Sequence, residues 1–165
     1  MSSPVLPFLC IRCGARRVTI RQEPGRTYTY RVFPSLPVPE NLGIPTCGRC
    51  YAVYIDEHTA ATLEPVLAAE YKRQLSRKGK QAIADLLPFI SQRELEKLAD
   101  ISQGYLSRIY GGHGTPSPQL VLLLALLAQD PTLLEWAARY WFEPSAAGAS
   151  PGTHGASLVP GRSGR

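Results

Sequence analysis

The sequence has no apolar run long enough to cross a lipid bilayer. Its longest one, Leu120 to Ala128, falls well short of the roughly 20 residues that a membrane-spanning helix needs. The first nine residues also lack the basic and long apolar segments of a secretory signal peptide. These absences predict a cytoplasmic protein with no membrane partner. In that compartment, paired cysteines favour metal or redox chemistry over structural disulfides.

Catalytic pairings are absent as well. The three histidines, His58, His113 and His154, are scattered, and none is placed in sequence with a cysteine and a carboxylate. Each is interpreted most simply as a solvated side chain. Because the sequence shows neither a nucleophile–base pair nor an open metal site, we expect no enzyme activity.

Positive charge is present but limited. The chain of 165 residues has a formal net charge of +5, and 44% of its residues are hydrophobic. This length suits one ordinary domain, or two small ones, with a packed core. A basic balance suits a polyanionic partner such as DNA, but a charge of +5 does not by itself identify one.

The four cysteines form two Cys-x-x-Cys pairs, Cys10 with Cys13 and Cys47 with Cys50. Each pair can place two thiolates on one metal ion within a tight turn, and two pairs complete a closed tetrahedral site. Zinc prefers this set of four sulfurs, and a closed site leaves no position for a substrate. We therefore predict one structural Zn²⁺ per chain, bound by these four cysteines.

Two other uses of the cysteines stay open. A thioredoxin-like redox dithiol requires a βαβ context, which the sequence around the two pairs does not show. Iron can also be bound by four thiolates, so the spacing alone does not separate iron from zinc.

Residues 1–55 are expected to form a small zinc ribbon. Apolar and polar residues alternate over 18–20 and again over 28–32, which is the periodicity of strands, and a turn signal separates the two. Prolines over 34–45 predict an irregular extended arm. Residues 51–55 predict a last short strand.

From residue 56 onward the periodicity is helical. Apolar residues recur every fourth position up to Leu75, which predicts a linking helix over 56–79 that Gly79 ends. A further helix is expected over 83–90. Ser117-Pro118 and Asp130-Pro131 then combine a capping residue with a proline, which is typical of a helix start. The two helices that they open are expected to run to about Ala128 and Trp141.

The predicted fold class is therefore α+β, with a zinc ribbon followed by an all-α repressor-like domain over 80–142. From 143 to 165 the chain is rich in Gly, Ser, Ala and Pro, and we predict a disordered tail.

The segment 90–110 predicts two short helices joined by a tight turn. Ser91 and Glu94 match a capping box for the first helix. Asp100 stands where the chain must turn and tolerates left-handed backbone, and Ser102 can cap the second helix. This is the layout of a helix-turn-helix, whose second helix enters the DNA major groove. An ordinary helical hairpin in a small α-helical core is the alternative interpretation.

The outward face of the second helix carries the predicted DNA contacts. Arg108 is expected to read a base, with Gln103 and Tyr105 in the groove nearby. Gln92 is expected to contact a phosphate, and Lys78 and Lys80 to add salt-dependent attraction. In the alternative interpretation Arg108 is a surface charge or a partner of Asp100 or Glu96, and the lysines belong to a solvated helix face. The complete predicted set is Gln92, Ser102, Gln103, Tyr105, Arg108, Lys78 and Lys80.

The order of these parts resembles the MqsA-type (YgiT-type) antitoxins of bacterial toxin–antitoxin systems, over roughly residues 8–142. The resemblance rests on the two Cys-x-x-Cys pairs, Ser91-Gln92, Leu106-Ser107-Arg108 and the loop from Gly112 to Pro118. It implies a structural zinc ribbon that binds a cognate toxin. It also implies a helical domain that dimerises and binds a palindromic operator in its own promoter.

In the family's best-known type the recognition helix carries an Asn and, four residues later, an Arg. Arg108 matches the Arg, whereas Gly104 stands at the Asn position. A second class of function therefore stays open, a protein-interaction adaptor that has lost specific DNA reading. Trp136, Tyr140 and Trp141 are the candidates for a homodimer interface.

Overall fold

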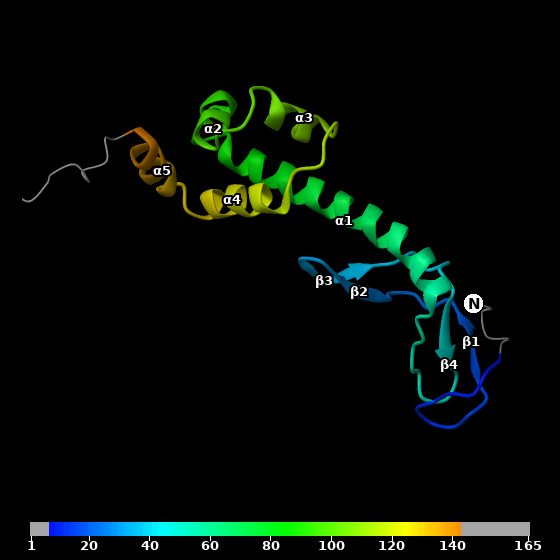
Figure 1. The fold of residues 1–165 in the computed structure, drawn as a ribbon. Coiled ribbons are helices and arrows are strands. Elements are labelled where there is room, and N and C mark those ends of the chain that lie inside the picture. The colour runs from blue at the N-terminus through cyan, green and yellow to red at the C-terminus, as the bar shows by residue number, and fades with distance from the viewer. Residues whose placement is uncertain (1–6, 143–165) are drawn as a thin grey trace, which may run out of the picture.

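The structure is a computed structural model that describes residues 7–142; the predicted tail at 143–165 lies outside this range. Within it the fold is mixed α+β, with four short strands followed by five helices (Figure 1). The elements are β1 Val18–Arg21, β2 Thr27–Tyr30, β3 Phe33–Pro37, β4 Ile44–Cys47, α1 Glu57–Leu86, α2 Gln92–Leu98, α3 Tyr105–Gly111, α4 Pro118–Gln129 and α5 Leu133–Phe142.

The strands form two nested antiparallel ladders. The inner ladder pairs β2 with β3, and the outer ladder pairs β1 with β4, with Val18 opposite Cys47. A backbone hydrogen bond from Val38 N–H to the Arg26 carbonyl continues the pairing between them. Figure 1 shows the inner ladder alongside α1 and the outer ladder beyond the start of that helix.

Two strand predictions were wrong. β3 and β4 lie inside the proline-rich segment expected to be an irregular arm, and residues 51–55 make only an isolated bridge between Val53 and Thr46. In β4, Pro45 serves as an acceptor, from Tyr54 N–H, and β3 pairs with β2 alone and so has one free edge. A proline, which lacks an N–H, can occupy such an edge without breaking the ladder.

The prediction that Gly79 ends the first helix was also wrong, because α1 continues to Leu86 and includes the first half of the helix expected over 83–90. Gly79 is buried inside it, and a Cβ there would lie 3.0 Å from Cγ of Pro116. Glycine costs about 1 kcal/mol relative to alanine in a helix interior. Here it allows α1 to pack closely against the loop before α4.

The long helix α1 contributes residues to two hydrophobic cores. Along its first half, Leu63, Leu67 and Tyr71 pack with Leu36 and Ile44 of the strand region. Along its last turns, α1 packs with α2, α3 and α4 in a second core. The residues of this second core are Ala82, Ile83, Leu86, Leu95, Leu106, Ile109, Leu120, Leu124 and Leu127.

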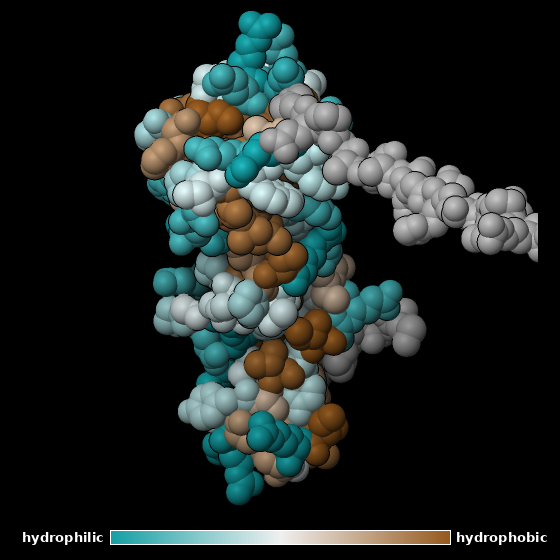
Figure 2. All heavy atoms as spheres, turned by 90° about the vertical axis from the view of Figure 1, so that its left-hand side faces the viewer, coloured by the Kyte–Doolittle hydropathy of each residue, from teal (hydrophilic) through white to brown (hydrophobic). Residues whose placement is uncertain are grey.

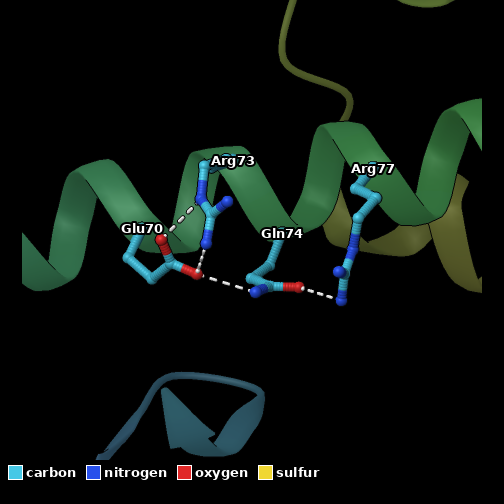
Figure 3. A network of polar contacts seen from close by, with 4 residues as sticks. All are labelled: Glu70, Arg73, Gln74 and Arg77. Carbon is cyan, nitrogen blue, oxygen red and sulfur yellow. Dashed lines mark hydrogen bonds and ion pairs between the residues drawn. The ribbon is translucent and has the colours of Figure 1, made fainter. Parts of the chain in front are cut away.

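The basic run on α1 is partly neutralised within its own helix. The Arg73 guanidinium donates from Nε and Nη2 to the two carboxylate oxygens of Glu70, at 2.7 and 2.8 Å. Gln74 donates to the same carboxylate at 2.7 Å, and Arg77 donates to Gln74 at 2.8 Å (Figure 3). This network lies along one exposed side of the helix.

The caps of the later helices largely follow the sequence. Ser117 accepts from Leu120 N–H at the start of α4, as predicted. Asp130 accepts instead from Thr132 N–H in a turn that precedes α5, so that helix starts at Leu133. None of the helices in the described part of the chain is both long and apolar enough to cross a membrane.

Candidate metal centre and the exposed face of α3

The four cysteines meet at one point. Their sulfur atoms all lie within 4.8 Å of one another, with Cys10 Sγ 3.5 Å from Cys50 Sγ and Cys13 Sγ 3.7 Å from Cys47 Sγ. Four sulfurs at about 2.3 Å from a tetrahedral Zn²⁺ lie about 3.8 Å apart. The donor set and its spacing therefore fit one metal ion, as the sequence predicted.

Two similar turns present the ligands. In the first, Gly14 N–H donates to the Cys10 carbonyl at 2.8 Å, and Gly14 has a φ of 69°. In the second, Tyr51 N–H donates to the Cys47 carbonyl at 3.1 Å, and Tyr51 has a φ of 58°. Each turn thus needs a left-handed residue after its second cysteine, which one turn supplies with glycine and the other with tyrosine.

The sulfurs lie in a polar setting that favours thiolates at two positions. The Tyr54 hydroxyl donates to Cys10 Sγ at 3.0 Å and lowers the pKa of that thiol to about 6. Backbone N–H groups of Cys50 and Arg49 lower the pKa of Cys47. Deprotonated thiols are the form that binds a metal.

The thiol of Cys13 differs from those of Cys10 and Cys47. The backbone N–H of Ala15 lowers its pKa, but burial and the neighbouring thiols outweigh that effect and raise the pKa to about 12. Four thiolates this close repel one another unless a positive ion lies between them. A bound metal ion would supply that charge.

Tyr54 is a residue of the candidate site that sequence reasoning missed. Its hydroxyl also accepts from Ile11 N–H at 3.0 Å, and its ring meets Phe8 edge-on at 5.3 Å. It follows Cys10 by 44 residues, so no local motif connects the two. The only sequence signal was an aromatic residue a few positions after the last cysteine.

The predicted DNA contacts lie on and just before α3. Ser102, Gln103 and Arg108 are exposed, Tyr105 is half-buried, and the Arg108 guanidinium lies 5.6 Å from the Tyr105 ring centroid. Leu106 and Ile109, on the other side of α3, are fully buried. The structure therefore brings Tyr105 and Arg108 together, whereas Gln103 lines a hollow beside α2.

The turn between α2 and α3 partly follows the prediction. The capping box of Ser91 and Glu94 is present at α2, and Asp100 has a φ of 50°. Ser102 does not cap α3, because the helix starts at Tyr105 after Gly104, which has a φ of 78° and offers no side chain. That prediction was wrong, since the cap comes from a residue distant in sequence.

Glu96 supplies the missing cap. Its buried carboxylate accepts from the N–H groups of Gly104 and Leu106, both at 2.9 Å. Burial raises the pKa of this carboxyl, but the two N–H donors and Gln92 outweigh burial and leave the pKa lowered. Glu96 is thus charged at neutral pH and fixes α3 against α2.

The remaining predicted contacts are dispersed. Gln92 donates from Nε2 to Glu96 at 3.3 Å, and Lys78 lines a groove between α1 and α4. Lys80 lies instead beside Gly112, at the end of α3.

Sequence reasoning missed Arg93 and Lys97, which line a hollow of about 390 Å³ together with Gln103. Their positions on the surface of α2 could have suggested them.

Comparison with known proteins gives no family for this chain, since no family model, curated protein or solved structure matches it.

Proposed function

We propose that the chain is a DNA-binding transcriptional regulator, built from a zinc ribbon and a helix-turn-helix. The ribbon is residues 7–55 around the four cysteines, with zinc as the metal. The helix-turn-helix is α2 and α3. In this proposal a homodimer places two copies of α3 on a palindromic operator, about one DNA turn apart.

One observation carries the DNA part of the proposal. α3 buries Leu106 and Ile109 and leaves Arg108 exposed, with the half-buried ring of Tyr105 against its guanidinium. An arginine on an exposed helix can pair with the two acceptors of guanine, a contact worth about 1–3 kcal/mol of discrimination. Glu96 fixes the orientation of this helix before DNA arrives, so less ordering entropy is lost on binding.

The resemblance to MqsA-type antitoxins suggests the biological setting. In that setting the protein represses its own promoter and its ribbon binds a cognate toxin. The candidate homodimer surface is the aromatic cluster on α5, where Trp136, Tyr140 and Trp141 are each more than half exposed. Trp136 stacks on Tyr140 with ring centroids 5.4 Å apart, so the cluster is pre-ordered for contact.

The test is binding of the full chain to the DNA upstream of its gene and to a scrambled fragment, at two salt concentrations. Arg108→Ala is expected to abolish the preference for the native fragment. Arg16→Ala, at an exposed arginine of the ribbon away from α3 and α5, is the matched control and keeps that preference. Lys78→Ala is expected to weaken binding to both fragments about equally. If Arg108→Ala keeps the wild-type ratio of affinities for the native and scrambled fragments, Arg108 is not the base-reading residue.

A second candidate function, a protein-interaction adaptor, is favoured by the apolar surface of α4. Leu122, Leu123 and Leu126 are 61%, 42% and 53% exposed. Figure 2 shows hydrophobic residues in several patches along the face that it draws, with hydrophilic residues between them. If the wild-type protein shows no preference between the two DNA fragments, this adaptor function replaces DNA reading.

A further inference from the structure

The positive charge of this protein is concentrated in its cysteine-containing part. Residues 1–55 contain seven arginines, no lysine and two glutamates, and so carry the whole formal charge of +5. The eleven basic residues after position 55 are balanced by eleven acidic ones. A Zn²⁺ ion with four thiolates contributes −2, so the zinc-loaded part keeps about +3 while the rest of the chain is balanced. The excess positive charge therefore lies away from α3, at the opposite end of the molecule (Figure 1).

Several of these arginines are not engaged by carboxylates. Arg26 pairs with Glu23, but Arg17, Arg21 and Arg49 have no ion-pair partner among residues 7–142. Arg17 and Arg49 are exposed, and Arg21 is half-buried. Arginine is the residue best suited to phosphate, because its planar guanidinium donates two parallel hydrogen bonds and also stacks on aromatic rings.

Arg21 lies beside the exposed Tyr51 ring, and the backbones of Arg17 and Arg49 adjoin Gly48 beneath its guanidinium. The Arg21 guanidinium lies 6.0 Å from the Tyr51 ring centroid, and its Nη2 passes over Gly48, 3.1 Å from where a Cβ would stand. Gly48 N–H donates to the Arg17 carbonyl at 2.8 Å, and Arg49 follows Gly48 directly. We call this group, Arg17, Arg21, Arg49 and Tyr51, the Tyr51 patch.

Tyr51 is unusual for its position. It is 67% exposed and holds a left-handed backbone, at the place where the other cysteine turn has Gly14. Glycine adopts that conformation without strain, whereas a tyrosine there is strained. An exposed ring kept at a strained position indicates that the ring itself has a use.

We propose that the Tyr51 patch binds single-stranded nucleic acid. The arginines contact successive phosphates, and the Tyr51 ring stacks on an unpaired base. Base stacking on an aromatic side chain requires an open base face, which a single strand offers and a duplex covers. This activity is independent of operator reading by α3.

The experiment measures binding of the full zinc-loaded chain to a twelve-residue oligouridylate and to the matching oligodeoxythymidylate. The key variant is Tyr51→Gly, because it removes the ring while relieving the backbone strain. It is expected to weaken binding about 5- to 150-fold, whereas Tyr51→Phe keeps the stacking and the affinity. Equal zinc content in all variants verifies that the cysteine site is intact.

The arginines are tested by salt dependence. Arg17→Gln and Arg49→Gln are each expected to reduce the slope of log K against log salt by about 0.7, the value for one lost phosphate contact on a single strand. Arg139→Gln on α5 is the charge-matched control and leaves both slope and affinity unchanged. Arg108→Ala also leaves them unchanged, so failure of this proposal is distinguishable from failure of operator reading.

Four outcomes overturn the proposal. These are no binding to either oligonucleotide, unchanged affinity in Tyr51→Gly, equal affinity for a twelve-base-pair duplex, and equal competition by polyglutamate. The last outcome assigns the patch to an acidic protein partner instead. Tighter binding of the oligouridylate indicates that the preferred single strand is RNA. Tighter binding of the oligodeoxythymidylate indicates that it is DNA. Either result supports the proposal.

Discussion

At the scale of single residues, the carboxylate of Glu96 decides the geometry of the predicted DNA-reading helix. Because it accepts the N–H groups of Gly104 and Leu106, Glu96→Gln is expected to lower the free energy of unfolding by about 1–2 kcal/mol at pH 7. Glutamine keeps the size but replaces one acceptor oxygen with an NH₂ group. Urea unfolding measures the loss, and Glu40→Gln in an exposed loop is the control.

The same residue predicts a pH dependence. The pKa of Glu96 is lowered below its usual 4.5 in the folded state, so its stabilisation is complete above that pH. It is lost as the pH falls through the lowered pKa. The difference between wild type and Glu96→Gln should therefore shrink in acid; a difference that stays constant from pH 7 to pH 3 contradicts this role.

Tyr54 has a comparable role at the cysteines. Tyr54→Phe removes the hydroxyl that donates to Cys10 Sγ and is expected to lower metal affinity about 10- to 100-fold, as for other residues that orient metal ligands. The measurement is competition with a chelator of known affinity. Tyr51→Phe, which changes an exposed ring, is the matched control and should leave the affinity unchanged.

At the scale of elements, the strand and helix boundaries show what sequence could and could not predict. The capping box at Ser91, the cap at Ser117 and the turn at Asp100 were predictable, because each depends on neighbours within a few residues. β3, β4 and the continuity of α1 were not, because they depend on partners elsewhere. The cap from Glu96 was missed for the same reason.

Gly79 gives the element-scale prediction. Gly79→Leu is expected to destabilise the fold by about 1–3 kcal/mol, because the side chain would press into Pro116, Val121 and Ile109. Ala61→Leu, at an exposed position of the same helix, is the control and should change little. Thermal unfolding compares the two. If Gly79→Leu is as stable as Ala61→Leu, α1 does not depend on this close approach.

At the scale of the whole molecule, residues 7–142 pack into three hydrophobic cores. The core around the cysteines has only Cys10, Val18 and Cys47 as buried hydrophobic members, whereas β3 shares a larger core with α1. The sequence predicted the cysteine set from its spacing alone. It did not predict that the ribbon is divided between two cores, because that depends on how the ribbon packs against α1.

This division predicts a partial unfolding on metal removal. A core this small cannot hold β1 and the Cys47 end of β4 without the metal, so chelation should remove amide protection there, whereas Ile44 at the start of β4 packs in the core with α1. Protection of the helical core around Leu86, Leu106 and Leu124 should remain. Hydrogen exchange of the full chain with and without chelator gives the comparison. Uniform loss of protection across all three cores would show that the metal holds the entire fold.

The proposed zinc site is the central claim, since the cysteines fit a metal ion and the ribbon has little other core. The most direct test is elemental analysis of the full chain purified without oxygen. We predict one zinc per chain and no iron, with the zinc lost when Cys10, Cys13, Cys47 or Cys50 is replaced by serine. Less than half an equivalent of zinc, or iron in its place, contradicts the account.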